Sequence, residues 1–282
     1  MRIIDTSQDM LSAYSGDSFD IEKWKIYIDS CVPGAKDICL NDMNECISAG
    51  FAWGKDYLPV LNLVPKDKTR LNEAIESFHK VTDDLNDKIL AAFGRTVDVD
   101  IILYLGLCNG AGWVTEVNGN LSVLLGIEKI MELKWCGVDD MTGLIVHELG
   151  HVYHSEYGRF YLETDKCSEK FLWQLFTEGV AMVFEQEVVG NQDYYNRDFE
   201  WTEWCRKNIE RIKNSFSCDL SSMTKENQRY FGDWVSFEGY GDTGYYLGTD
   251  FVRFLLEKDS FDKVISYGIE DVKAGFELYN KK

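Results

Sequence analysis

Three of the four histidines in the chain lie within one short stretch, Gly143–His154, which reads GLIVHELGHVYH. His147 and His151 are four residues apart, and on an α-helix this spacing places two imidazoles one turn apart on the same face. Zinc binds imidazole nitrogens at about 2.0–2.1 Å, so the two rings can share one ion. The spacing therefore predicts a helical pair of zinc ligands.

Glu148 directly follows the first of these histidines and lies about 100° around the helix from it. From there it can reach a water molecule on the metal without ligating the metal, which is what a general base requires. Ile145, Leu149 and Val152 recur at helical spacing and can bury the helix while the histidines face a cleft. The competing interpretation is a chance HExxH pattern on an ordinary amphipathic helix, which the scarcity of histidine disfavours.

A catalytic zinc site usually has three protein ligands and leaves one position for water. His154 is the nearest candidate, but three ligands from successive turns of one straight helix would strain to surround one ion. We therefore expect it to support a ligand or line the cleft. The pattern HExxHxxGxxH is absent, because His154 and Tyr157 occupy the positions of its glycine and its last histidine.

A carboxylate from a later segment can be the third ligand, and WQLFTEGVAMVFEQE (Trp173–Glu187) offers the best candidate. Glu178 is followed by Gly179 and Ala181, small residues that would let its helix approach the histidine helix closely. Gly150 lowers helix propensity and fits the same close approach. A solvated helix residue is the competing interpretation of Glu178. The reserve candidates for this ligand are Glu163, Asp165 and Glu169.

The elements expected before the histidine helix are short helices such as Asp20–Ser30, a longer helix over Lys68–Phe93 and several strands. The apolar stripe of the longer helix includes Phe78, and His79 beside it is interpreted as a surface or packing histidine. Strands are expected within Val97–Leu107 and in the segments WVTEV and LSVLLGI. These two segments are joined by Asn118-Gly119-Asn120, which is typical of a tight hairpin turn.

The remaining chain reads as helical. Helices are expected at about Asp140–Glu156, Ser168–Val189, Phe199–Phe216 and Thr243–Lys258, and near the C-terminus. A small mixed β-sheet with an active-site helix, followed by a mostly helical C-terminal region, is an α+β arrangement. We expect a helical N-terminal region over residues 1–95 and a catalytic domain over residues 96–282.

Composition limits the class of protein and its partners. Hydrophobic residues make up 45% of the chain and aromatic residues 14%, which supports a folded core rather than disorder. The net charge of −19 disfavours nucleic acid and anionic membrane surfaces as partners, although acidic residues also simply keep a protein dispersed. No apolar run reaches membrane-spanning length and no secretory signal is evident. The scattered cysteines lack a CxxC pair, so we expect reduced thiols in the cytoplasm.

The site residues resemble those of the gluzincin zinc metallopeptidases, in which a glutamate on a second helix follows the HExxH helix. HELGH and WxxxxEGxAxxxE, at Trp173–Glu185, resemble the boxes of the aminopeptidase N branch and, more closely, the bacterial YjaZ-like zinc proteases. The resemblance covers about Val97–Leu256 and leaves the N-terminal region unmatched. It implies that His147, His151 and Glu178 bind Zn²⁺ and that Glu148 is the catalytic base.

The segment GYYLGTDFVRFLL, Gly244–Leu256, adds one more candidate. In the aminopeptidase-like branch a similarly placed tyrosine donates a hydrogen bond to the developing oxyanion, which suits a phenol. The resemblance assigns this role to Tyr245, with Tyr246 as the reserve. Packing is the competing interpretation, since the chain has fifteen tyrosines.

One departure from the aminopeptidases bears on specificity. A GxMEN-like segment, whose glutamate holds the free amino terminus of a substrate, is absent from the sequence. The strands Gly110–Val117 and Leu121–Ile127 could instead pair with an extended peptide along a sheet edge, although their glycines also suit ordinary turns. We therefore expect a cytoplasmic zinc endopeptidase that acts on a peptide or protein. The alternatives are a regulatory protease that cleaves a repressor-type partner and a non-catalytic zinc protein that binds peptides.

Overall fold

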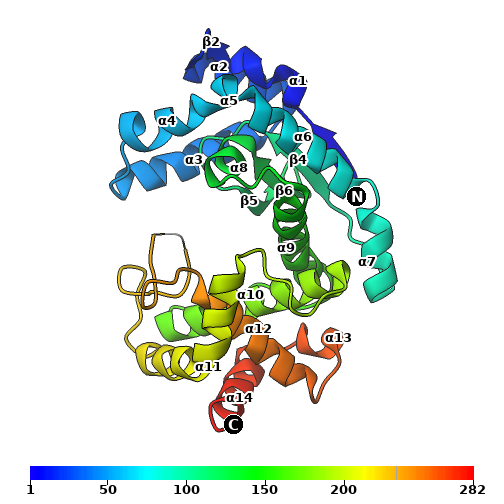
Figure 1. Ribbon diagram of the computed structural model, residues 1–282, viewed down its shortest axis with the longest axis vertical. Helices are drawn as coiled ribbons and strands as arrows, with labels where there is room; N and C mark the ends of the chain where they lie inside the picture. The colour runs from blue at the N-terminus through cyan, green and yellow to red at the C-terminus, as the bar shows by residue number, and fades with distance from the viewer. Residues whose placement is uncertain (233) are drawn as a thin grey trace. The chain divides into compact units, whose positions relative to one another are not determined.

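The computed structural model describes residues 1–232 and 234–282 (Figure 1). Contacts within the chain define two compact units, Met1–Glu148 and Leu149–Lys282. The boundary in the chain falls inside one continuous helix, α9 (Val138–Tyr157), which carries the HExxH pattern. The strands β1 to β6 all belong to the first unit, and the elements of the second unit are helices α10 to α14 together with the second half of α9. The α+β class expected from the sequence is confirmed.

The first unit is built on a four-stranded mixed sheet in the order β1-β4-β6-β5. Its strands are β1 (Arg2–Asp5), β4 (Asp100–Tyr104), β5 (Gly112–Val117) and β6 (Asn120–Gly126). The pairs β1–β4 and β4–β6 are parallel, whereas β5 runs antiparallel to β6. Strand β5 is therefore at one edge of this sheet. A separate two-stranded hairpin consists of β2 (Tyr14–Ser15) and β3 (Ser18–Phe19).

The turn between β5 and β6 has the geometry that its sequence predicts. Asn118 and Gly119 have φ values of 51° and 80°, and Val117 pairs with Asn120. Two successive left-handed residues are typical of a type I′ turn, whose twist matches that of the flanking strands. The expected hairpin is confirmed.

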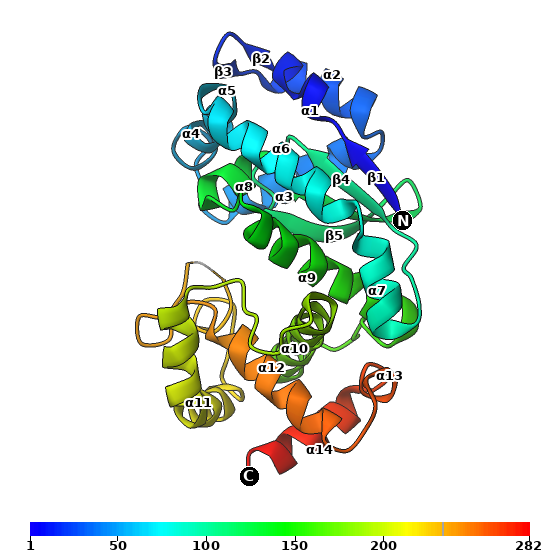
Figure 2. The same ribbon diagram turned by 45° about the vertical axis from the view of Figure 1, so that its right-hand side comes forward.

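Helices surround this sheet (Figure 2). The longer ones are α2 (Ile21–Cys31), α3 (Ala35–Ser48), α6 (Lys68–Thr82) and α7 (Leu85–Phe93). The shorter ones are α1 (Ser7–Met10), η1 (Leu11–Ala13), the π-helix η2 (Trp53–Tyr57), α4 (Leu58–Leu61), α5 (Leu63–Lys66) and α8 (Ile127–Leu133). Asp20 caps α2 by accepting hydrogen bonds from the amides of Glu22 and Lys23. The single helix expected over Lys68–Phe93 is two helices, because the chain breaks at Asp83 and Asp84, a residue type that favours helix ends over interiors.

The two units are defined by contacts alone, and the helical N-terminal region over residues 1–95 and the catalytic domain over residues 96–282 stay predictions. Strand β1 comes from the N-terminal region and pairs with β4, while α4, α5 and α6 pack on α8. Residues on both sides of position 95 therefore share one compact unit.

The second unit centres on α10 (Cys167–Val189), which packs most extensively on α12 (Thr243–Leu256) and also on α14 (Ile269–Tyr279). Helix α11 (Phe199–Asp219) packs on α12, and α13 (Phe261–Val264) is a single turn. All four long helices expected after the strands are present, as is the expected C-terminal helix. Across the described part of the chain, no helix combines the length and the apolar character needed to cross a membrane.

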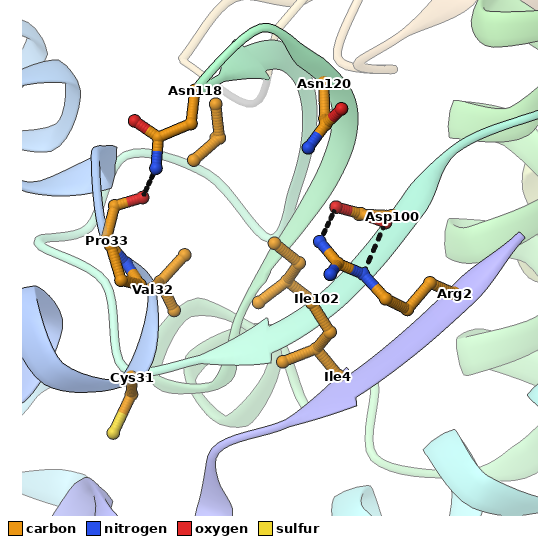
Figure 3. Close-up of a pocket in the computed structure, with 10 residues that line it drawn as sticks. Arg2, Ile4, Cys31, Val32, Pro33, Asp100, Ile102, Asn118 and Asn120 are labelled. Carbon is orange, nitrogen blue, oxygen red and sulfur yellow. Dashed lines mark hydrogen bonds and ion pairs between the residues drawn. The ribbon is translucent and has the colours of Figure 1, made fainter.

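A cavity of about 240 Å³ lies over β1 and β4 in the first unit (Figure 3). Apolar side chains line much of it, namely Ile4, Val32, Ile102 and Val117. At its rim the guanidinium of Arg2 pairs with Asp100, and the Asn118 amide donates to the Pro33 carbonyl at 2.6 Å. The side chains that line this cavity include none of the site residues predicted from the sequence.

Candidate metal centre

The exposure of α9 distinguishes the predicted site residues from their neighbours. Between Gly143 and His154, the half-buried positions are His147, Glu148 and His151, and every other position is buried. The predicted core stripe, Ile145, Leu149 and Val152, is completely buried. The helix therefore presents its two candidate ligands and its candidate base to a partly open environment, as its amphipathic pattern predicts.

Glu178 occupies a comparable position on α10. Between Phe171 and Gln186 the half-buried residues are Gln174 and Glu178, and all others are buried. The Glu178 side chain is 15% exposed, so it is not a solvated surface residue. Its Oε2 atom lies 3.3 Å from Nε2 of His151, whose side chain is 12% exposed.

His147, His151 and Glu178 together form a group that could hold a metal ion. Taking one ligand atom from each, all three atoms lie within 4.8 Å of one another. Ligand atoms around one tetrahedral zinc ion lie about 3.3 Å apart, given bonds of about 2.0–2.1 Å. The separation of 3.3 Å between Nε2 of His151 and Oε2 of Glu178 already matches this value. Two imidazoles and a carboxylate also form a donor set that zinc accepts with one position left open.

Gly150 lets the histidine helix α9 pack closely on α10, and Gly179 lets α10 pack closely on α12. A Cβ atom on Gly150 would lie 2.7 Å from Cα and 3.0 Å from the carbonyl oxygen of Ala181. A Cβ atom on Gly179 would lie 2.2 Å from the carbonyl oxygen of Gly248. Both distances are too short for any side chain, so backbone packs on backbone at these points. The predicted close approach between the histidine helix and α10 is confirmed for Gly150 and Ala181, whereas the prediction was wrong for Gly179, which packs on α12 instead.

Glu148 stands outside the triad and extends along the start of strand β5. A Cβ atom on Gly112 would lie 3.0 Å from Cγ and 3.2 Å from Oε1 of Glu148, and 2.8 Å from Cδ1 of Leu144. The glycine therefore leaves room for the carboxylate beside the edge strand. Glu148 is thus a half-buried carboxylate next to two candidate ligands and outside their donor set, and its role as a base stays a prediction.

The two candidate tyrosines differ in their surroundings. Tyr246 is 8% exposed, and its ring stacks on Tyr195 with a centroid separation of 4.9 Å. Tyr245 is half-buried, and Phe231 contacts its ring edge-to-face at 5.9 Å. Tyr245 also begins the turn that leads to Gly248, which packs against Gly179 next to Glu178. The packing therefore favours Tyr245 over Tyr246, and its role stays a prediction.

His154 is fully buried rather than facing a cleft. Its Nε2 atom is 3.1 Å from the carbonyl oxygen of Ile265, to which it donates a hydrogen bond. The rings of Phe160 and Phe176 contact it edge-to-face. Burial lowers the pKa of its imidazole to about 3, so the ring is neutral at ordinary pH. His154 is therefore a packing residue that ties α9 to the segment after α13.

The reserve ligands lie outside the metal-binding group. Glu163 and Asp165 are exposed in the segment between α9 and α10. Glu169 binds Lys273 at 2.7 Å, Thr164 at 2.6 Å and Lys166 at 3.0 Å. These hydrogen bonds lower the pKa of its carboxyl to about 2. Elsewhere, Nε2 of His79 lies 2.8 Å from Asp5 Oδ2, which agrees with a surface histidine.

Sequence reasoning missed Glu128, a fully buried carboxylate in α8. Its two oxygens accept hydrogen bonds from the amides of Gly106 and Cys108, each at 2.9 Å. Burial raises the pKa of the Glu128 carboxyl to about 7, although these hydrogen bonds oppose the rise. The loop that it holds leads into Gly112 and β5. The sequence signal of this tight packing is a pair of glycines, Gly106 and Gly126, whose Cβ atoms would lie 2.6 Å and 3.1 Å from Oε1 of Glu128.

Comparisons with family models, with curated proteins and with solved structures found no match for the chain. The resemblance to the gluzincins therefore stays a prediction. The case for a metal site rests on the geometry of His147, His151 and Glu178.

Proposed function

We propose that the protein is a zinc-dependent endopeptidase. The observation that carries the proposal is the group formed by His147, His151 and Glu178, with Glu148 half-buried beside it on the same helix turn. A two-nitrogen, one-oxygen donor set leaves a position for water, which suits catalysis better than a closed structural site.

In the proposed reaction the chain supplies ligands, a base and a hydrogen-bond donor. Bound zinc would lower the pKa of a water molecule and polarise the scissile carbonyl. Glu148 accepts a proton as the water oxygen adds to the carbonyl carbon, and it gives that proton to the amine nitrogen as the C–N bond breaks. The Tyr245 hydroxyl donates a hydrogen bond to the carbonyl oxygen as negative charge develops there. The products are a carboxylate and an amine.

The edge strand supports an extended peptide as the substrate. Strand β5 is at the edge of its sheet, and the Glu148 side chain lies against Gly112 at the start of this strand. A peptide that paired with β5 through main-chain hydrogen bonds would pass beside Glu148. No GxMEN-like segment is present to hold a free amino terminus. We therefore propose cleavage within a chain, and a cytoplasmic location on the ground of the scattered cysteines.

The test combines metal analysis with digestion of a mixed peptide pool, read by mass spectrometry. We expect about one zinc per chain and new peptide termini that appear only with the wild-type protein. His147→Ala should lose both metal and cleavage. If the wild-type protein binds no zinc when zinc is supplied in excess, the metal site is refuted. Zinc binding without any cleavage would favour a peptide-binding protein.

A further inference from the structure

Phe160 contacts the imidazole of the candidate ligand His151. The centroids of the two rings are 5.4 Å apart and their planes are tilted by 55°. The same phenyl ring contacts His154 edge-to-face at 5.7 Å. Phe160 is half-buried and lies in the segment that connects α9 to α10. One aromatic side chain thus covers two successive histidines of α9.

The backbone of Phe160 is held by a residue of α10. The indole Nε1 of Trp173 donates a hydrogen bond to the Phe160 carbonyl at 2.7 Å. Trp173 is 6% exposed, and its ring packs on Phe176 at 5.3 Å. Next to Phe160, the amide of Arg159 donates to the Ile265 carbonyl at 2.8 Å. The backbone that carries the phenyl ring is therefore anchored to α10, the helix that also carries Glu178.

We propose that Phe160 is a positioning residue for His151 and that it orients the imidazole for metal binding. The torsion that turns an imidazole about its Cβ–Cγ bond is broad and restricts the ring little by itself. A phenyl ring in contact with the imidazole narrows that range and keeps Nε2 directed toward Glu178, 3.3 Å away. The inference rests on the proposed function, because it concerns the same metal-binding group.

The neighbouring aromatic residue provides a matched control. Tyr161 is 72% exposed and packs edge-to-face on Phe160 at 5.2 Å. Its ring contact is with Phe160 rather than with a histidine. Removing Tyr161 therefore changes the same segment and a similar side chain without removing the ring that contacts His151.

The experiment measures the affinity of the full-length protein for Zn²⁺ by competition with a chelator. It also records the absorption spectrum of the Co²⁺-loaded protein and the thermal unfolding of the metal-free protein. Residues that orient metal-binding histidines change affinity by about 10- to 100-fold when removed. We expect a loss of this size for Phe160→Ala, a smaller loss for Phe160→Leu, and a shifted Co²⁺ spectrum for both. Trp173→Phe, which removes the indole donor, should also weaken binding, whereas Tyr161→Ala should bind zinc as the wild type does.

The outcomes separate this inference from the proposed function. If the wild-type protein binds zinc but Phe160→Leu and Trp173→Phe bind it equally tightly with an unchanged Co²⁺ spectrum, Phe160 does not position His151 and the metal site stands. If thermal stability falls while affinity and spectrum do not change, Phe160 is only a packing residue and the inference is overturned. A wild-type protein that binds no zinc would refute the metal site itself. The leucine and Trp173 variants keep the test decisive even if Phe160→Ala fails to fold.

Discussion

Gly179→Ala should destabilise the second unit and weaken metal binding together. The new Cβ atom would lie 2.2 Å from the carbonyl oxygen and 2.4 Å from the carbonyl carbon of Gly248, and neither backbone atom can rotate away. Ordinary contacts between such atoms are about 3.5 Å, so α10 and α12 must move apart by about 1 Å. Glu178 is the preceding residue, and this movement would displace it from His151.

The expected change in the free energy of unfolding of Gly179→Ala is the balance of a clash and a gain in helix propensity. Overpacking a buried contact costs about 1–3 kcal/mol, and the upper end applies here because both clashing atoms belong to the backbone. Replacing glycine by alanine in a helix returns about 1 kcal/mol. We therefore expect a net loss of about 2 kcal/mol in the free energy of unfolding, measured by denaturant titration of the metal-free protein.

Gly275→Ala is the matched control, because it is the same substitution inside a helix of the same unit. Its Cβ atom would lie 2.7 Å from Cδ2 of Leu255, the end of a flexible side chain that can move. We expect its stability to remain within about 1 kcal/mol of the wild type, with unchanged zinc affinity. Wild-type stability in Gly179→Ala would refute the close backbone packing of α10 on α12.

Three further predictions follow from the surroundings of single carboxylates. Gly112→Ala should lower peptide hydrolysis while zinc content stays at the wild-type level, because the new Cβ would lie 3.0 Å from Cγ of Glu148, which is outside the proposed set of ligands. An unchanged rate would contradict the tight contact. Burial raises the pKa of the Glu128 carboxyl from 4.5 to about 7 in the folded chain. Between these two pH values the folded state keeps the proton that the unfolded state has lost. The free energy of unfolding should therefore fall by about 3 kcal/mol as the pH rises from 4.5 through 7. Denaturant titrations across this range should show that Glu128→Gln removes this part of the pH dependence, and an unaltered slope would exclude the residue as its source. Chelator competition should release zinc from Glu178→Ala and not from Glu163→Ala, and the reverse order would identify a different third ligand.

The sequence predicted those features of the structure that depend only on the chemistry and spacing of neighbouring residues. The four-residue spacing of His147 and His151 fixes their common face on any helix, and Asn118-Gly119 adopts the left-handed conformations that its residue types tolerate. Glu178 was identifiable because small residues follow it and because a zinc site needs a third ligand. In each case a few adjacent residues determine the outcome.

The features that sequence missed depend on contacts between distant segments. Strand β1 is short and largely exposed, and it forms a strand because β4 pairs with it from about 100 positions away in the chain. The contact of Phe160 with His151 depends on a hydrogen bond from Trp173 on another helix. Similarly, nothing next to Glu128 in the sequence indicates that two amides of the loop after β4 would surround its carboxylate.

Glu148→Gln tests most directly whether Glu148 is the base of a zinc peptidase, as we propose. The substitution keeps nearly the same shape but removes the group that accepts a proton, and it leaves His147, His151 and Glu178 intact. Zinc content and folding should match the wild type, while hydrolysis of a cleavable peptide should fall by about 10²- to 10⁴-fold. A Glu148→Gln protein that binds zinc and cuts the same peptide at the wild-type rate would contradict the proposed mechanism.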